Sequence, residues 1–204
     1  MRVTIFDYGA GNLHSLAKAL EVEDVEVSVE TDPVQSVDTD VLVLPGVGAF
    51  GAAVERLGAG RDVMRGAMLA GLPTIGICLG MQLFFDASDE GEGVGLGVIP
   101  GRVRRLAARR VPQIGWNEVI PARDDELFRS APLPIAYYAN SFVCRPTTDD
   151  CVIAWTTHEE DRFPAAVRAG AVVGVQFHPE KSSRAGVEFL HAFLRETSNN
   201  RGLQ

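Results

Sequence analysis

Apolar and polar positions alternate with two different periods along the first half of the chain. Four runs have the length and pattern of strands: residues 3–6, 25–29, 41–44 and 72–77. The run at 41–44 is continuously apolar, which is typical of a strand buried on both faces of a parallel sheet. Three stretches have helical spacing: residues 12–20, 52–57 and 62–70. Strands that alternate with helices predict an α/β domain with a largely parallel sheet.

The second half changes to short strands with short connections, after a glycine-rich stretch at residues 89–101. Strands are predicted at residues 102–106, 112–120, 134–143, 152–156, 165–169 and 172–177. Residues 124–129 predict one or two helical turns. A last helix is predicted over 182–197, with Ser182 or Ser183 as its cap, followed by a polar, frayed tail at 198–204. We expect a single domain over residues 1–204.

Composition narrows the class of protein. Apolar residues make up 46 % of the 204 positions, which argues against disorder, and the net charge of −8 argues against nucleic-acid or anionic-membrane binding. No apolar run reaches the ~18 residues of a membrane span. The three sparse cysteines and the lack of a signal-peptide pattern fit a reducing cytosol. No two Cys or His residues have metal-ligand spacing, so neither a metal nor a cofactor is expected. A basic cluster at residues 102–110 fits either an acidic partner or a solvated strand face.

The strongest chemical signal is a cysteine in the middle of Gly76-Ile77-Cys78-Leu79-Gly80. It lies between a predicted strand and a predicted helix over residues 79–85. A tight strand-to-helix turn exposes its middle side chain, and a helix N-terminus favours a thiolate. An ordinary buried cysteine acts only as a small apolar residue, and that is the alternative. The glycines on both sides favour a nucleophile.

A proton-handling partner is predicted a hundred residues later, at His178. Residues i and i+2 of an extended segment point the same way, so Glu180 can orient the imidazole. Cys78, His178 and Glu180 would then act as nucleophile, base and orienting group. The alternative is a surface histidine beside a solvated glutamate. Both Cys78 and His178 follow predicted parallel strands, whose carboxyl ends form the ligand sites of open α/β sheets.

A second glycine-rich turn, residues 46–51, has the glycine spacing of a dinucleotide-binding fingerprint. That function also needs an acidic residue at the end of the next strand, which instead ends at Cys78. We therefore favour a loop of backbone donors, in which Val47 or Gly48 acts with the Leu79 N–H as an oxyanion hole. A plain strand-to-helix turn is the remaining alternative.

Four strings, in this order and spacing, carry a family resemblance: P-G-V-G-A-F at 45–50, G-I-C-L-G-M-Q at 76–82, G-W-N at 115–117 and Q-F-H-P-E-K-S at 176–182. The chain resembles the class I, triad-type glutamine amidotransferases, and among them the glutaminase subunits of imidazole glycerol phosphate synthase. The resemblance runs from residue 7 to the last helix. It implies a three-layer, flavodoxin-like fold with a mostly parallel central sheet, an antiparallel second half and helices on both faces.

The resemblance also implies roles for individual residues. Cys78 would attack the amide of glutamine, while His178 moves protons and Glu180 orients it. Substrate contacts are implied for Gln82, Glu90, Ser141 and Phe142. A partner interface is implied at Asn12, Trp116, Asn117, Tyr137 and Lys181. The partner would be a (β/α)₈ synthase subunit that receives the ammonia and makes imidazole glycerol phosphate and AICAR in histidine biosynthesis.

Two departures and several alternatives remain. The family usually has histidine where this chain has Gln113, and His-Ser-Tyr where it has Asn140-Ser141-Phe142. Neither departure touches the triad. Other possible functions are an amidotransferase subunit of the pyridoxal phosphate, purine or tryptophan pathway, a stand-alone γ-glutamyl thiol hydrolase, and a non-catalytic binding protein.

Overall fold

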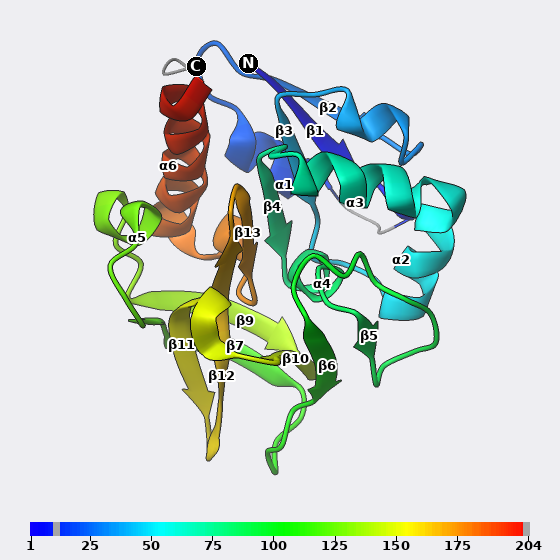
Figure 1. Ribbon diagram of the computed structural model, residues 1–204. Helices are drawn as coiled ribbons and strands as arrows, with labels where there is room; N and C mark the ends of the chain where they lie inside the picture. The colour runs from blue at the N-terminus through cyan, green and yellow to red at the C-terminus, as the bar shows by residue number, and fades with distance from the viewer. Residues whose placement is uncertain (10–12, 202–204) are drawn as a thin grey trace.

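The computed structural model describes residues 1–9 and 13–201, and Figure 1 shows their arrangement. The strands of the largest sheet are β1 (Arg2–Phe6), β2 (Glu26–Glu30), β3 (Val41–Leu44), β4 (Thr74–Ile77), β8 (Ile120–Pro121), β11 (Val152–His158), β12 (Asp161–Ala169) and β13 (Val172–Val175). Two smaller sheets contain β5 (Ala87–Ser88), β6 (Gly101–Arg105) and β10 (Phe142–Pro146), and β7 (Gln113–Glu118) with β9 (Ile135–Asn140). The helices are α1 (His14–Leu20), α2 (Phe50–Leu57), α3 (Arg61–Leu69), α4 (Leu79–Gln82), α5 (Glu126–Ser130) and α6 (Ser183–Arg201).

The eight-stranded sheet has the order β2-β1-β3-β4-β13-β12-β11-β8. Its first five strands are parallel, and β12, β11 and β8 continue it in antiparallel pairs. β4 and β13 lie next to each other although about a hundred residues separate them in the chain. The predicted α/β fold, with a parallel first half and an antiparallel second half, is confirmed.

Helices cover both faces of the central sheet, because successive strand side chains point to opposite sides. Val41 and Val43 belong to the apolar cluster that includes residues of α1 and α6. Leu42 and Leu44 belong to the other cluster, with residues of α2 and α3. All four side chains are fully buried, which explains the continuous apolar run. In Figure 1, α3 crosses one face of the sheet and α6 lies at the other side of the molecule.

The strand predicted over residues 134–143 is wrong in one respect, because it is two strands. The chain leaves the first pairing at Ser141, whose carbonyl accepts the N–H of Leu106 at 2.9 Å. β9 pairs with β7, whereas β10 pairs with β6. One apolar stretch therefore serves two different sheets.

The helix predicted over residues 79–85 is also shorter than expected, and α4 ends at Gln82. Leu83, Phe84 and Phe85 are all fully buried. Three consecutive side chains cannot all face the core from one regular helix, because helical neighbours are spread around the axis. The chain therefore turns, with Phe84 and Phe85 donating to the carbonyls three residues before them.

The frayed tail predicted at 198–204 is wrong for its first residues, since α6 continues to Arg201. The hydroxyls of Thr197 and Ser198 donate back to the carbonyls of Phe193 and Leu194, at 3.0 and 3.1 Å. Along the stretches of chain that the structure describes, no helix combines the length and apolar character needed to cross a bilayer.

Candidate active site

Cys78 forms a strained elbow between β4 and α4, with φ of 48° and ψ of −102°. Residues other than glycine rarely adopt this conformation, and such strain is concentrated at functional sites. Close packing requires both flanking glycines. A Cβ on Gly76 would lie 2.6 Å from the backbone of Gly80, and one on Gly80 would overlap the carbonyl oxygen of Leu44. The spacing in Gly76-Ile77-Cys78-Leu79-Gly80 thus has a steric cause.

β13 brings the second part of the site beside this elbow. Val175 pairs with Ile77 in parallel register, and the carbonyl of Val175 accepts the Cys78 N–H at 2.7 Å. Gln176 and His178 therefore leave the sheet next to Cys78. The Gln176 side chain donates from Nε2 to Cys78 Sγ at 3.4 Å. The sequence interpretation missed this contact, although residues 176 and 178 have the i, i+2 spacing that places two side chains on one face.

The imidazole of His178 meets the cysteine in a tightly filled space. A Cβ on Gly46 would lie 2.8 Å from His178 Cε1 and 3.1 Å from Cys78 Cβ. The ring is 2 % exposed, and its Nδ1 lies 2.8 Å from Oε1 of Glu180. The structure therefore brings the three residues of the predicted triad together.

The route by which Glu180 reaches His178 differs from the prediction. Residues Pro179–Lys181 form a 3-10 turn, η4, and are not extended. Proline fixes its own φ near the helical value, which favours this turn directly after His178. The Glu180 side chain is 9 % exposed, and its Oε2 has no hydrogen-bond partner among residues 1–9 and 13–201.

Two opposing effects set the charge of His178. Burial alone lowers the pKa of an imidazole because it disfavours the cation. Hydrogen bonds to Cys78 and Glu180, together with their negative charges, outweigh burial and raise the pKa of His178 to about 9. At neutral pH the ring is therefore an imidazolium, held between the thiol and a carboxylate.

The three predicted oxyanion donors are the backbone N–H groups of Val47, Gly48 and Leu79. Each belongs to a segment that adjoins Cys78. Val47 and Gly48 follow Gly46, and Gly48 has a φ of 113°. Leu79 is the first residue of α4, so its N–H has no acceptor inside the helix. Within the described part of the chain, no group accepts a hydrogen bond from these three N–H groups.

The residues implied as substrate contacts fall into two places. Gln82 Nε2 donates to the carbonyl of Phe142 at 3.1 Å, and Asn140 Nδ2 donates to the same oxygen at 3.2 Å. In the chain, Ser141 lies between Asn140 and Phe142. Glu90 is separate, because its Oε2 accepts the N–H of Phe50 at the start of α2, at 2.9 Å.

The departures at positions 113 and 140 are direct neighbours, since Gln113 and Asn140 are register partners on β7 and β9. Both are buried. Neither amide atom of Gln113, nor Oδ1 of Asn140, has a hydrogen-bond partner in the described residues. No feature of the structure explains the glutamine at 113.

Of the residues implied at the partner interface, Trp116 and Lys181 are exposed, whereas Asn117 and Tyr137 are half-buried. Trp116 and Tyr137 are register partners whose rings meet edge to face at 6.1 Å, and Ile114 beside them is 67 % exposed. Lys181 is exposed in η4. Asn117 points to the opposite face of β7, where its Nδ2 donates to the carbonyl of Thr157 at 2.9 Å. Asn12 lies outside the described residues.

β9 is directly attached to the backbone of the triad histidine. The N–H of His178 donates to the carbonyl of Tyr137 at 2.8 Å. Ser182 Oγ accepts the N–H of Tyr137 at 2.9 Å and donates to the carbonyl of His178 at 2.7 Å. The predicted helix cap thus uses its hydroxyl to join the strand to the site.

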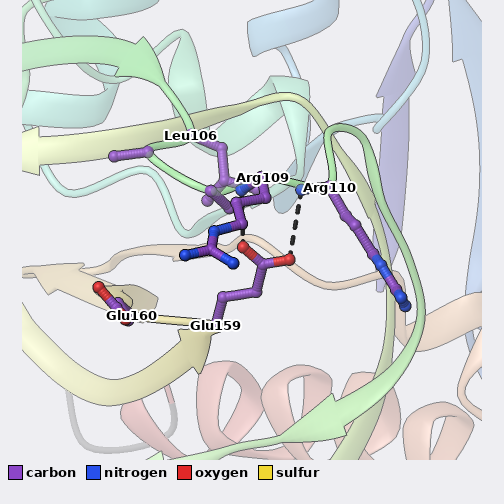
Figure 2. Close-up of a pocket in the computed structure, with 7 residues that line it drawn as sticks. Leu106, Arg109, Arg110, Glu159 and Glu160 are labelled. Carbon is purple, nitrogen blue, oxygen red and sulfur yellow. Dashed lines mark hydrogen bonds between the residues drawn. The ribbon is translucent and has the colours of Figure 1, made fainter.

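A groove with a different lining lies elsewhere on the surface. It has a volume of about 740 Å³ and is lined by residues 106–110 with Glu159 and Glu160. Figure 2 shows Glu159 accepting the backbone N–H groups of Arg109 and Arg110, at 2.6 and 3.3 Å. No triad residue lines it. A smaller cavity of about 180 Å³ adjoins Glu180, Lys181 and Val47. Among the described residues, no three His, Cys, Asp or Glu side chains are grouped to hold a metal ion.

Known proteins share both the sequence and the fold. The family model for class I glutamine amidotransferases matches residues 4–197. This chain therefore belongs to the class I glutamine amidotransferase family, and the resemblance expected from its motifs is confirmed.

Individual relatives carry more specific names than the family does. A Halobacterium salinarum protein named imidazole glycerol phosphate synthase subunit HisH is 42 % identical over 201 residues, which cover 94 % of this chain and 92 % of that protein. A protein of the same name from Symbiobacterium thermophilum is 45 % identical over 194 residues, covering 93 % and 91 %. The solved structure of PurLQS from Thermotoga maritima has a TM-score of 0.73 at 20 % identity, over 96 % of this chain and 98 % of that one. This last likeness concerns the fold alone.

Proposed function

We propose that this chain is the glutamine-hydrolysing subunit of imidazole glycerol phosphate synthase and acts in histidine biosynthesis. The observation that carries the chemistry is the grouping of Cys78, His178 and Glu180, with 2.8 Å between the histidine and the carboxylate. The choice among amidotransferases rests on relatives that are more than 40 % identical over more than nine tenths of the chain.

The first half of the proposed reaction forms a thioester. The Cys78 thiolate attacks the side-chain amide carbon of glutamine, and the carbonyl oxygen takes up the negative charge. The N–H groups of Leu79 and of Val47 or Gly48 stabilise that oxyanion. The His178 imidazolium gives its proton to the amide nitrogen, the C–N bond breaks, and ammonia leaves.

The second half hydrolyses the thioester. His178, now neutral, takes a proton from water while the water oxygen attacks the thioester carbon. The C–S bond breaks, glutamate leaves, and the cysteine returns as a thiolate beside an imidazolium. Glu180 holds Nδ1 through both halves, which fixes the tautomer and stabilises the imidazolium.

We assign the substrate contacts to Gln82, Ser141, Phe142 and Glu90. The Phe142 carbonyl supports this assignment, because two amide side chains, Gln82 and Asn140, fix its position. A backbone fixed by two hydrogen bonds keeps its position when a small polar substrate binds beside it. Glu90 lies at the start of α2, which follows the 46–48 loop in the chain, because its carboxylate accepts the Phe50 N–H.

The exposed face of β7 and β9 is the proposed contact with a (β/α)₈ synthase subunit, which would receive the ammonia. Exposed apolar side chains support this contact: Ile114, Trp116 and Ile135 are each more than half exposed. Contiguous exposed apolar residues are typical of interaction sites. The backbone N–H of His178 donates to the carbonyl of Tyr137, so strand β9 of this face is hydrogen-bonded directly to a residue of the proposed triad. A stand-alone hydrolase has no need of such a face.

Co-expression with a barrel-type synthase subunit tests the proposal. We expect glutamate and ammonia release to rise when the synthase is bound, and Cys78→Ala to abolish it. Cys151→Ala is the matched control and should keep full activity, because that thiol is partly exposed and donates to the carbonyl of Thr148, which is not a residue of the proposed triad. Steady glutamine hydrolysis that ignores the synthase would favour the stand-alone hydrolase. Unchanged ammonia release in Cys78→Ala would refute both enzymes.

A further inference from the structure

Gln176 is the only amide side chain of the described residues that donates to the sulfur of Cys78. It is fully buried, so water cannot compete for this contact. Its carbonyl oxygen, Oε1, has no hydrogen-bond partner in the part of the chain that the structure describes. A buried amide with an unused acceptor is unfavourable for stability. The amide at this position therefore lowers the stability of the fold.

The backbone aims this amide at the sulfur. β13 runs parallel to β4 in the register Val175 to Ile77, so the next residues, Gln176 and Cys78, are opposite each other. The chain bends after β13, and the side chains of Gln176 and His178 both reach Cys78, while the fully buried Phe177 between them belongs to the core. The sulfur thus has two partners from one segment, the amide of residue 176 and the imidazole of residue 178.

The chemistry of the two partners differs. The imidazolium gives its proton to the nitrogen of the substrate amide, which leaves as ammonia, whereas the N–H of the Gln176 amide keeps its proton throughout. A thiolate is acceptor only, so it favours the NH₂ end of the amide. When the sulfur is expelled from the thioester, His178 has just taken a proton from water, so the imidazolium and the amide can both donate to the thiolate. Of these two groups, only the amide has kept its donor through every step.

We infer that Gln176 is a further catalytic residue, whose side-chain N–H holds the Cys78 sulfur as a thiolate in the resting site and as the leaving group of the second half-reaction. This inference rests on the proposed role of Cys78 as nucleophile. It goes beyond that role by assigning to the sulfur a donor that does not change its protonation state.

The test measures the sulfur directly and needs neither glutamine nor a partner. Alkylation of Cys78 by iodoacetamide is followed by peptide mass spectrometry across pH, in the wild-type chain and in Gln176→Met and Gln176→Leu. Gln113→Met is the matched control, since Gln113 is also a buried amide but makes no hydrogen bond to Cys78. Melting curves verify that each variant is folded.

The other titratable groups near the sulfur stay constant in these variants. They are His178 with Glu180 behind it, Tyr8 after β1, and Cys144 on β10. Burial, and then the charge of Cys78, raises the pKa of both Tyr8 and Cys144, so neither ionises in the range of the titration.

We expect the pH midpoint of Cys78 alkylation to rise by about one to two pH units in both Gln176 variants, as for the loss of one hydrogen bond to an ionised group. The control should keep the wild-type midpoint. An unchanged midpoint in both variants overturns the inference even if glutaminase activity is present. A shift in only one variant, or in Gln113→Met as well, assigns the effect to packing and also overturns it. A shift in a chain without glutaminase activity would keep the stabilised thiolate of the resting site, and would reject the proposed function together with the role of Gln176 in the second half-reaction.

Discussion

Gly46 is the position where the smallest addition should disturb the site most. A methyl group there would lie 2.8 Å from His178 Cε1, 3.1 Å from Cys78 Cβ and 3.1 Å from Ile77 Cγ2. Carbon atoms pack best at about 3.5–4.0 Å, so all three neighbours would be too close. Gly46→Ala therefore acts as a wedge between the imidazole and the cysteine.

The size of the effect follows from these distances. The imidazole must move by roughly half an ångström or more to restore ordinary contact. A displacement of about 1 Å at a reacting centre reduces the rate by about 10²-fold, so we expect kcat/KM for glutamine to fall about ten- to a hundredfold. Overpacking should also lower the free energy of unfolding by about 1–3 kcal/mol. Gly46 is not among the glycines with positive φ, so backbone strain does not contribute.

Glutamate release by the assembled enzyme, together with urea unfolding, measures both effects. Gly66→Ala on α3 is the matched control, because a Cβ there meets nothing within 4 Å. It should leave kcat/KM unchanged and stabilise the helix by about 0.5–1 kcal/mol. A folded Gly46→Ala enzyme with wild-type kcat/KM would refute the assignment of catalysis to this pair.

Three other predictions concern charge. The pKa of His178 is raised to about 9, so the imidazolium that protonates the departing amide nitrogen persists through neutral pH. On the alkaline side, kcat/KM should therefore fall only above about pH 9, and a decline that begins near pH 7 would contradict this. Glu180→Gln removes the charge that favours the imidazolium, so glutamine turnover should drop by about 10²–10⁴, and a variant with full turnover would reject the triad. Arg168→Met leaves two largely buried carboxylates without their cation, Asp125 at the N-terminus of α5 and Glu196 on α6, so urea unfolding should show a loss of about 3–5 kcal/mol. Arg2→Met breaks only an exposed pair with Asp38 and should lose less than about 1 kcal/mol, so equal losses would contradict the role of burial.

Elements with a local cause were predictable from the sequence. The strand at 41–44 was predicted with both of its ends, because two-sided burial requires an unbroken apolar run. The division of residues 134–143 was not predictable, since its cause is a choice between two distant partners, β7 and β6. β5 has only two residues, directly before the glycine-rich stretch, and exists through its pairing with β6. Tertiary pairing, which no local pattern records, decided both.

The candidate site divides in the same way. Cys78 and His178 could be paired in advance, because both follow parallel strands and such strand ends share one edge of a sheet. The contact of Glu180 was expected for the wrong reason, since a 3-10 turn and not an extended segment brings it to the ring. The hydrogen bonds of Gln176, Ser182 and Asn140 depend on register and on a break at residue 141, so they required coordinates.

The bonds that join Tyr137, Ser182 and His178 have a thermodynamic consequence. Free-energy coupling between two binding sites is reciprocal. If a protein bound over Tyr137 alters the setting of His178, then a ligand occupying the thiol must alter the affinity of that protein by the same factor. Glutamine, or an analogue trapped on Cys78, should therefore change the dissociation constant of the complex. Strand β9 would then transmit the state of the active site to the partner, as well as the binding of the partner to the active site.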